Sequence, residues 1–347
     1  MQLNQATLVK ATGRLIPVLL TIIAVILVVH ALKATRPVTM PVAFAFFITV
    51  LTDPLQKWLE RHLPKWLSMF IVLVVLASVV GIFLGAVELS LDLIEPKLPE
   101  YADRLQSVVQ SIRGWLQSYG LPTGGGEQAR GAIVELLQQA VGSVQSLLGL
   151  LSLLILVASF LSLLLLEASK YRDRTQRAFP DGVGDRIIHA ISNMGQKLRR
   201  YFVVVAFTSL LTGISTSLWC LLLGVDLAFV WGLLAFILNF IPTLGSIIAA
   251  ITPALIATLF QGPAIGAATL VGLAIFQTVL GNFVDPKLQG KYLKLSPSVA
   301  LFSIVFWGWV WGIPGAFIGV PMTAAIILFA NEFKSSRPIA IMLGGVD

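Results

Sequence analysis

Long uncharged hydrophobic segments, separated by short charged ones, dominate the chain. The clearest are residues 15–32, 38–52, 67–87, 147–166, 201–225 and 262–284, none of which contains Asp, Glu, Lys or Arg. A helix needs about 20 apolar residues to cross a bilayer core of about 30 Å, so all but the short segment 38–52 have the expected length. The pattern predicts an all-α polytopic membrane protein with about six full spans.

Two further uncharged stretches, 227–260 and 295–331, are too long for one span. At about 1.5 Å per residue, a straight helix over the first would be about 51 Å long. The middle of the first reads Asn239-Phe240-Ile241-Pro242-Thr243-Leu244-Gly245-Ser246, and that of the second reads Trp311-Gly312-Ile313-Pro314-Gly315. Proline removes a helical hydrogen bond and clashes with the preceding turn, so we expect a break in each stretch.

Broken backbone at membrane depth is tolerated only where protein or a watery cavity satisfies its polar groups. A pair of Gly/Pro-interrupted hydrophobic segments is therefore a sequence pointer to the binding site of a transporter. The alternative is that both stretches are ordinary proline-kinked spans, because Pro and Gly are common in membrane helices.

The whole chain divides into four parts. They are 1–87 with the first three spans, the polar region 88–146, 147–200 with the fourth span and a basic segment, and 201–347 with the two broken stretches. Residues 88–145 carry seven acidic and four basic residues, which favours the outside. Two apolar stripes at helical spacing predict a helical hairpin there, whose stripes pack on each other or on another subunit. The first stripe comprises Tyr101, Leu105, Val108, Ile112 and Trp115, and the second comprises Ile133, Leu137, Ala140, Val144 and Leu147.

Basic residues set the topology. The segment 167–200 holds eight Lys or Arg and is expected in the cytoplasm, with an interfacial helix around 187–198. The loop 285–294 has three lysines. If both broken stretches are re-entrant hairpins with arms of about 12 to 16 residues, this loop and both termini are cytoplasmic. If they are single crossings, the loop lies outside.

Neutral hydrogen-bonding side chains gather near the breaks. We expect a substrate site that includes Asn239, Pro242, Thr243, Gly245, Ser246, Gln277, Asn282 and Pro314. Gly312, Gly315, Gly319 and Pro321 are expected hinge or close-packing positions, and Asp285, Pro286 and Lys287 belong to the cytoplasmic loop. The alternative for each polar residue is a hydrogen bond between membrane helices.

The sequence shows no pattern typical of a disulfide, a metal site or an enzyme active site. The single cysteine, Cys220, excludes an intrachain disulfide, and three scattered histidines form no metal-ligand spacing, so no metal or cofactor is expected. No nucleophile–base pair, paired carboxylate motif or ATP-binding loop appears, so the chain is not expected to be an enzyme. The net charge of +7 reflects cytoplasmic loops and needs no nucleic-acid partner.

The C-terminal half resembles the autoinducer-2 exporter superfamily of bacterial membrane proteins. The similarity rests on 239–245, Pro253, Gln277 and Asn282 ahead of Asp285-Pro286, then Gly290, 295–297 and the closing 307–321. The N-terminal half agrees through the short second span, which is expected to end at Asp53-Pro54, where the family usually has Asn. The resemblance implies an inner-membrane exporter, a homo-oligomer such as a pentamer, and an elevator-like movement.

Three functions remain open. The first is export of a small polar organic solute, such as autoinducer-2, by alternating access. The second is sodium–proton exchange, which needs an ionisable group within the membrane; between Tyr201 and Asn331 the only acids are Asp226 and Asp285, both at predicted span ends. The third is a channel-like or envelope scaffold role without transport.

Overall fold

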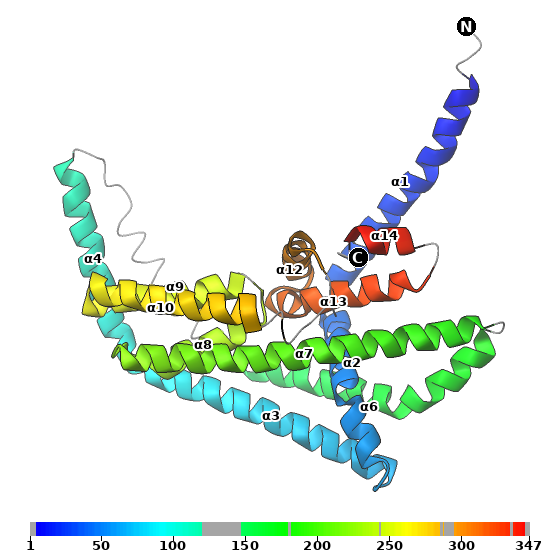
Figure 1. The fold of residues 1–347 in the computed structure, drawn as a ribbon, viewed down its shortest axis with the longest axis horizontal. Coiled ribbons are helices and arrows are strands. Elements are labelled where there is room, and N and C mark those ends of the chain that lie inside the picture. The colour runs from blue at the N-terminus through cyan, green and yellow to red at the C-terminus, as the bar shows by residue number, and fades with distance from the viewer. Residues whose placement is uncertain are drawn as a thin grey trace.

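The computed structural model describes residues 5–119, 147–179, 182–242, 244–284, 287, 295–333 and 336–343 (Figure 1). Every element in these ranges is a helix. In order they are α1 (Gln5–Ala34), α2 (Arg36–Leu59), α3 (Lys65–Ile94), η1 (Glu95–Lys97), α4 (Leu98–Ser118), α6 (Leu147–Ala178), α7 (Val183–Leu222), α8 (Ala228–Leu238), α9 (Leu244–Gln261), α10 (Pro263–Val279), the π turn η2 (Leu280–Val284), α12 (Pro297–Trp311), α13 (Ile313–Asn331) and α14 (Arg337–Leu343).

Six of the described helices are long and apolar enough to cross a membrane: α2, α3 with η1, α7, α9, α10 with η2, and α13. Shorter apolar helices cover Leu19–Ala34, Leu153–Glu167, Ala228–Leu238 and Pro297–Trp311. The described part of the chain is therefore all-helical. Four of the predicted spans, 38–52, 67–87, 201–225 and 262–284, lie almost entirely in these long helices, whereas 15–32 and 147–166 overlap only the shorter apolar helices Leu19–Ala34 and Leu153–Glu167. The other two long helices, α9 and α13, come from the two broken stretches.

The N-terminal helices α2, α3 and α6 share one buried cluster, whose members include Ala45, Val72 and Leu161. The opposite side of α2 contributes Met40 and Phe47 to a second cluster, which joins it to α7, α12 and α13. Helix α1 projects away from this body toward the N-terminus (Figure 1). Helix α2 is thus the element on which the N-terminal and C-terminal halves meet.

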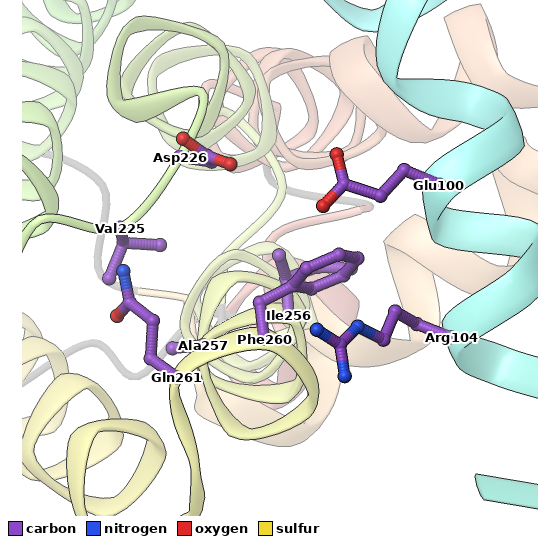
Figure 2. A pocket seen from close by; sticks show the side chains of 8 residues that line it. All are labelled: Glu100, Arg104, Val225, Asp226, Ile256, Ala257, Phe260 and Gln261. Carbon is purple, nitrogen blue, oxygen red and sulfur yellow. The ribbon is translucent and has the colours of Figure 1, made fainter. Parts of the chain in front are cut away.

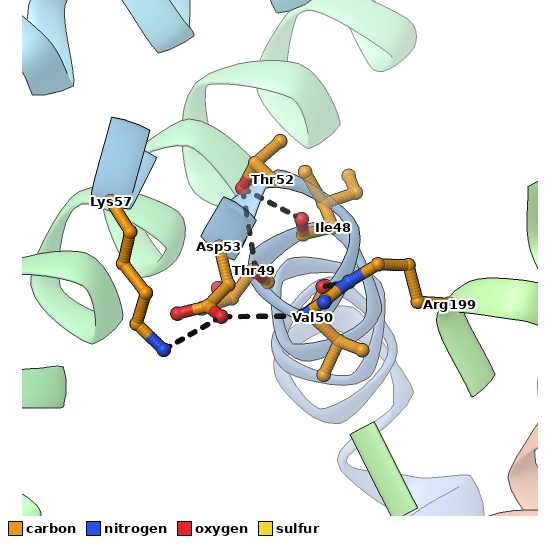
Figure 3. Close-up of polar contacts among 7 residues, drawn as sticks. All are labelled: Ile48, Thr49, Val50, Thr52, Asp53, Lys57 and Arg199. Carbon is orange, nitrogen blue, oxygen red and sulfur yellow. Dashed lines mark hydrogen bonds and ion pairs between the residues drawn. The ribbon is translucent and has the colours of Figure 1, made fainter. Parts of the chain in front are cut away.

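The expected end of the second span at Asp53-Pro54 is wrong, because α2 continues to Leu59. Pro54 has no N–H, so it leaves the carbonyl of Val50 without its helical donor. Figure 3 shows Arg199 of α7 filling this place: its Nε donates to the Val50 oxygen at 3.0 Å, and its Nη2 lies 3.2 Å from Asp53 Oδ2. A distant side chain therefore lets the helix pass through the proline.

The helix expected around 187–198 is present, but it is not a separate element. One continuous α7 of 40 residues runs from Val183 to Leu222. The change from basic to apolar sequence at Arg200 and Tyr201 contains no helix breaker, so the backbone hydrogen bonding continues across it. Leu198 and Tyr201 are both buried on either side of that boundary.

Each broken stretch forms a helical hairpin, called here hairpin 1 (α8–α9) and hairpin 2 (α12–α13). The first arms have 11 and 15 residues, while the second arms have 18 and 19, which is longer than the expected 12 to 16. Pro253 and Pro321 lie inside the second arms without ending them. The second arms are long enough to cross a membrane on their own, and the first arms are not.

The expected external hairpin is described only in part. Helix α4 forms its first half and projects from the body beside α9 and α10 (Figure 1). Tyr101 at its start is buried, and its ring centroid lies 4.6 Å from that of Phe260 in α9, whereas Trp115 is exposed. All members of the second predicted stripe except Leu147, the first residue of α6, lie outside the described residues.

Candidate solute site at two helix breaks

The first break lies between Leu238 at the end of α8 and Leu244 at the start of α9. Two of its backbone amides bond to carbonyls of the same segment. The amide of Ile241 donates to the Leu238 carbonyl at 2.8 Å, and the amide of Gly245 donates to the Ile241 carbonyl at 3.0 Å. A Cβ on Gly245 would overlap the carbonyl oxygen of Leu238, so only glycine fits this turn. The predicted break is present, and much of its backbone is satisfied locally.

The second break is a single residue, Gly312, with φ of 74°. This left-handed conformation strongly favours glycine, and a Cβ there would come within 2.9 Å of Arg36 Nη2. Beyond it, a Cβ on Gly315 would overlap the Trp307 carbonyl, and one on Gly319 would lie 2.8 Å from the Ser303 carbonyl oxygen. These two glycines therefore allow α13 to pack closely on α12.

The two breaks lie close together. Phe240 in the first break stacks on Phe317 near the start of α13, with ring centroids 6.1 Å apart. Phe240 and Ile241 also pack against a buried cluster formed by Tyr201, Val205, Ile304 and Val320. The two breaks, which are about 70 residues apart in the sequence, therefore lie next to each other in the fold.

The side chain of Asn239 is held at the first break by α7. Its Nδ2 donates to Ser209 Oγ at 3.0 Å. Ser209 belongs to a buried row of hydroxyls, the α7 seam, defined as Thr208, Ser209, Thr212 and Thr216. Within the described part of the chain, Thr212 Oγ1 is buried and has no hydrogen-bond partner. A buried hydroxyl without a partner is rare in folded proteins.

The α7 seam was not among the site residues predicted from the sequence. Ser209, Thr212 and Thr216 recur at spacings of 3 and 4, which puts them on one helix face. That periodicity was the sequence signal from which this row of hydroxyls could have been predicted. It was weak because Ser and Thr in helices commonly bond back to their own preceding carbonyls, as Thr208 does to Val205.

The other predicted site residues are scattered. Pro242, Ser246 and Pro314 are half-buried at their respective breaks, and Gly245 and Pro321 are buried. Gln277 is half-buried on α10, and Asn282 is exposed in the π turn. None of the hydrogen bonds described for this structure joins these two amides to the breaks. Lys287 is exposed, and Thr243, Asp285 and Pro286 lie outside the described residues.

The chemistry of the assembled groups is neutral. The Asn239 amide and the Ser209 hydroxyl meet between α8 and α7, the other hydroxyls of the α7 seam are buried, and the stacked rings of Phe240 and Phe317 join the first break to hairpin 2. Among the described residues, no group of three or more His, Cys, Asp or Glu could hold a metal ion. The arrangement can exchange hydrogen bonds with a small polar molecule.

The sequence model of the AI-2E family of transporters matches residues 16–335. The chain is 27% identical to the AI-2 transport protein TqsA of Escherichia coli, over 98% of each chain. It is also 29% identical to a putative transport protein of Haemophilus influenzae, over 95% of this chain and 96% of the relative, and 28% identical to one of Borreliella burgdorferi.

These relatives and the apolar helices together point to a multi-pass protein of the bacterial inner membrane. A family of transporters also favours a function other than catalysis. Because the match extends over nearly the whole chain, from the first apolar helix to beyond hairpin 2, the protein belongs to the AI-2E family of transporters.

Proposed function

We propose that this protein exports a small, uncharged, polar organic solute of the autoinducer-2 class by alternating access. One observation carries the proposal: the break at Asn239 is hydrogen-bonded to the buried α7 seam at Ser209, and one turn further along α7 lies the Thr212 hydroxyl, for which the described residues supply no hydrogen-bond partner. Neutral donors and acceptors of this kind suit hydroxyl and carbonyl groups on a ligand. The name of the relative TqsA supports the same class of solute.

The absence of a carboxylate at the breaks argues against cation–proton exchange, which needs an ionisable group within the membrane. Between Tyr201 and Asn331 the sequence has only Asp226 and Asp285. Asp226 lies at the open end of hairpin 1, half exposed, with its Oδ2 3.1 Å from Lys97 Nζ. A site of neutral groups is better matched to a neutral solute.

The proposed topology has both hairpins re-entrant. In hairpin 1 the end of α9 returns to the start of α8, where the Gln261 amide donates to the Gly224 carbonyl. With 11 residues, α8 spans about 17 Å from that open end to Asn239, which is about half of a bilayer core. Hairpin 1 then opens to the outside, hairpin 2 opens to the cytoplasm, and both termini are cytoplasmic.

Transport in this scheme moves a unit made of hairpin 1, α10 and hairpin 2 against the N-terminal helices. The contacts that must change include Trp311 Nε1, which lies 3.4 Å from the Leu32 carbonyl, and Lys33, whose Nζ is 4.1 Å from the Trp309 ring centroid. We propose a homo-oligomer, with five copies as the family resemblance implies, in which the N-terminal helices stay fixed.

The decisive experiment is solute flux in proteoliposomes. Purified protein should carry autoinducer-2 across the membrane faster than empty liposomes do, and an imposed proton or sodium gradient will show which ion drives it. Flux equal to that of empty liposomes under every gradient would refute export of this solute class. Exchange of sodium for protons in the absence of solute would support the antiporter instead.

A further inference from the structure

A polar cleft lies away from the helix breaks, at the open end of hairpin 1. It has a volume of about 200 Å³ and is lined by Glu100 and Arg104 of α4, by Asp226 before α8, and by Phe260 and Gln261 at the end of α9. Figure 2 shows the carboxylates of Glu100 and Asp226 on either side of the opening, with the Arg104 side chain beside Phe260. The cleft is formed only because α4 docks on hairpin 1.

The docking of α4 is well defined. Tyr101 is buried against Phe260, and this burial raises the pKa of its phenol to about 12. Lys97 Nζ lies 3.1 Å from Asp226 Oδ2 and 3.9 Å from Glu100 Oε2. The elements on both sides of the cleft are therefore joined by an aromatic contact and by an ion pair.

Charges around the cleft balance. Two carboxylates, Glu100 and Asp226, face two cations, Lys97 and Arg104. Lys97 is engaged with the acids, whereas Arg104 makes no ion pair within the described part of the chain; its guanidinium carbon lies 6.0 Å from the Phe260 ring centroid. A balanced set of this kind attracts neither anions nor cations strongly but offers strong acceptors and strong donors to one ligand.

We propose that this cleft binds a small, neutral, polyhydroxylated solute. Hydroxyl hydrogens would be donated to Glu100 and to the carboxylate oxygen of Asp226 that Lys97 leaves free, while a ring or hydroxyl oxygen would accept from Arg104. The Phe260 ring offers an apolar face to the carbon skeleton. One water molecule needs about 10–15 Å³ of such space, so a cleft of about 200 Å³ has room for a small organic molecule.

The cleft lies at the end of hairpin 1 that the proposed topology puts outside. It would then hold solute on its way out, after release from the breaks. This place on the release path rests on the proposed export function; binding to the cleft does not. Occupancy would also bridge α4 and hairpin 1, because the two carboxylates belong to different elements.

Protection of a cysteine tests the proposal. In a Cys220→Ala background, Gln261→Cys places a reporter on the cleft, and its rate of reaction with a membrane-impermeant maleimide is measured in nanodiscs at increasing D-ribose. We expect ribose to slow labelling at least threefold and saturably, whereas isosmotic betaine leaves the rate unchanged. Glu100→Gln and Arg104→Gln should each raise the half-protecting concentration about tenfold.

The matched control is Asp103→Asn, which removes an exposed carboxylate of α4 that does not line the cleft. Its half-protecting concentration should stay unchanged. Equilibrium dialysis of radiolabelled D-ribose against the wild-type, Glu100→Gln and Asp103→Asn proteins repeats the comparison without cysteines. No saturable protection or binding, or equal values in the Glu100 and Asp103 variants, would overturn the proposal.

Flux measurements separate this proposal from the export function. Saturable protection in a protein that carries no solute across the membrane would retain the cleft and refute export. Solute flux in a protein whose cleft cysteine is never protected would refute the cleft alone.

Discussion

Arg199 donates a hydrogen bond of 3.0 Å from its Nε to the main-chain oxygen of Val50, a residue 149 positions earlier in the sequence. That oxygen lacks a helical donor because Pro54 lies four residues beyond it. The same guanidinium contacts Asp53, which also pairs with Lys57 at 2.9 Å. The Arg199 side chain therefore replaces the missing backbone donor to Val50 and also connects α7 to α2 (Figure 3).

Replacing Arg199 by Met should lower the free energy of unfolding by about 1–3 kcal/mol, because the Val50 carbonyl then loses its donor. In a Pro54→Ala background the loss should be smaller, since the new amide at residue 54 can bond to Val50. Thermal unfolding in detergent of the four proteins measures this coupling. Lys57→Met is the control, with an expected loss below about 1 kcal/mol for an exposed ion pair; an Arg199 effect that is identical with and without Pro54 would contradict the explanation.

The contact between Asn239 and Ser209 predicts a transport phenotype. Asn239→Ala removes a proposed ligand contact, and Ser209→Ala releases the Asn239 amide, so each should reduce solute flux per molecule about fivefold, equivalent to about 1 kcal/mol. Protein abundance should change little. Ser215→Ala is the control, because the described bond of that hydroxyl is to its own helix at Leu211. Flux that is normal in both variants would remove Asn239 from the site.

Hairpin 2 predicts opposite outcomes for two glycines. Gly315→Ala puts a methyl group into the Trp307 carbonyl, so we expect the arms to separate and the protein to lose about 1–3 kcal/mol of stability. Gly308→Ala makes only an ordinary contact, at 3.5 Å from the Ala316 Cβ, and should be tolerated. Thermal unfolding of the two variants gives the comparison, and equal melting temperatures would be inconsistent with this packing.

The re-entrant topology predicts which positions face outward. In the Cys220→Ala background, cysteines at Asp226 and Gly125 should react with an impermeant maleimide added to intact cells, while those at Arg174 and Gln289 should react only after permeabilisation. Arg174 is the internal reference because it lies in the most basic segment of the chain. Labelling of Gln289 from outside would replace the re-entrant hairpins by single crossings.

Local sequence was sufficient for the breaks and insufficient for the contacts between helices. Pro242 with Gly245, and Gly312 with Pro314, act on their own backbone, so the sequence located both breaks to within a few residues. Pro54 has the same local chemistry, yet α2 continues because Arg199 supplies the missing donor. No pattern near Pro54 could reveal a partner 149 positions away.

The candidate site shows the same division. Asn239 was predicted because an amide in a broken apolar segment is conspicuous, whereas its partner Ser209 lies in an unbroken helix and resembles any helical serine. No site was predicted at Glu100 or Asp226, because the cleft between them exists only once α4 has docked on hairpin 1. The sequence shows which residues could bind a ligand, but only the folded structure shows which residues contact one another.

Movement of the hairpin unit against the N-terminal helices can be tested with a reversible cross-link between Lys33→Cys and Trp309→Cys. The native side chains are in contact at 4.1 Å, so a short bis-methanethiosulfonate can join α1 to α12 in the Cys220→Ala background. The control disulfide, Gly308→Cys with Ala316→Cys, lies within hairpin 2, where the two Cβ positions are 3.5 Å apart. If the hairpin unit moves, we expect solute flux in proteoliposomes to stop when α1 is cross-linked to α12 and to return when reductant is added. Flux should continue in the protein that carries the control disulfide. Undiminished flux through the protein cross-linked at residues 33 and 309 would contradict this movement.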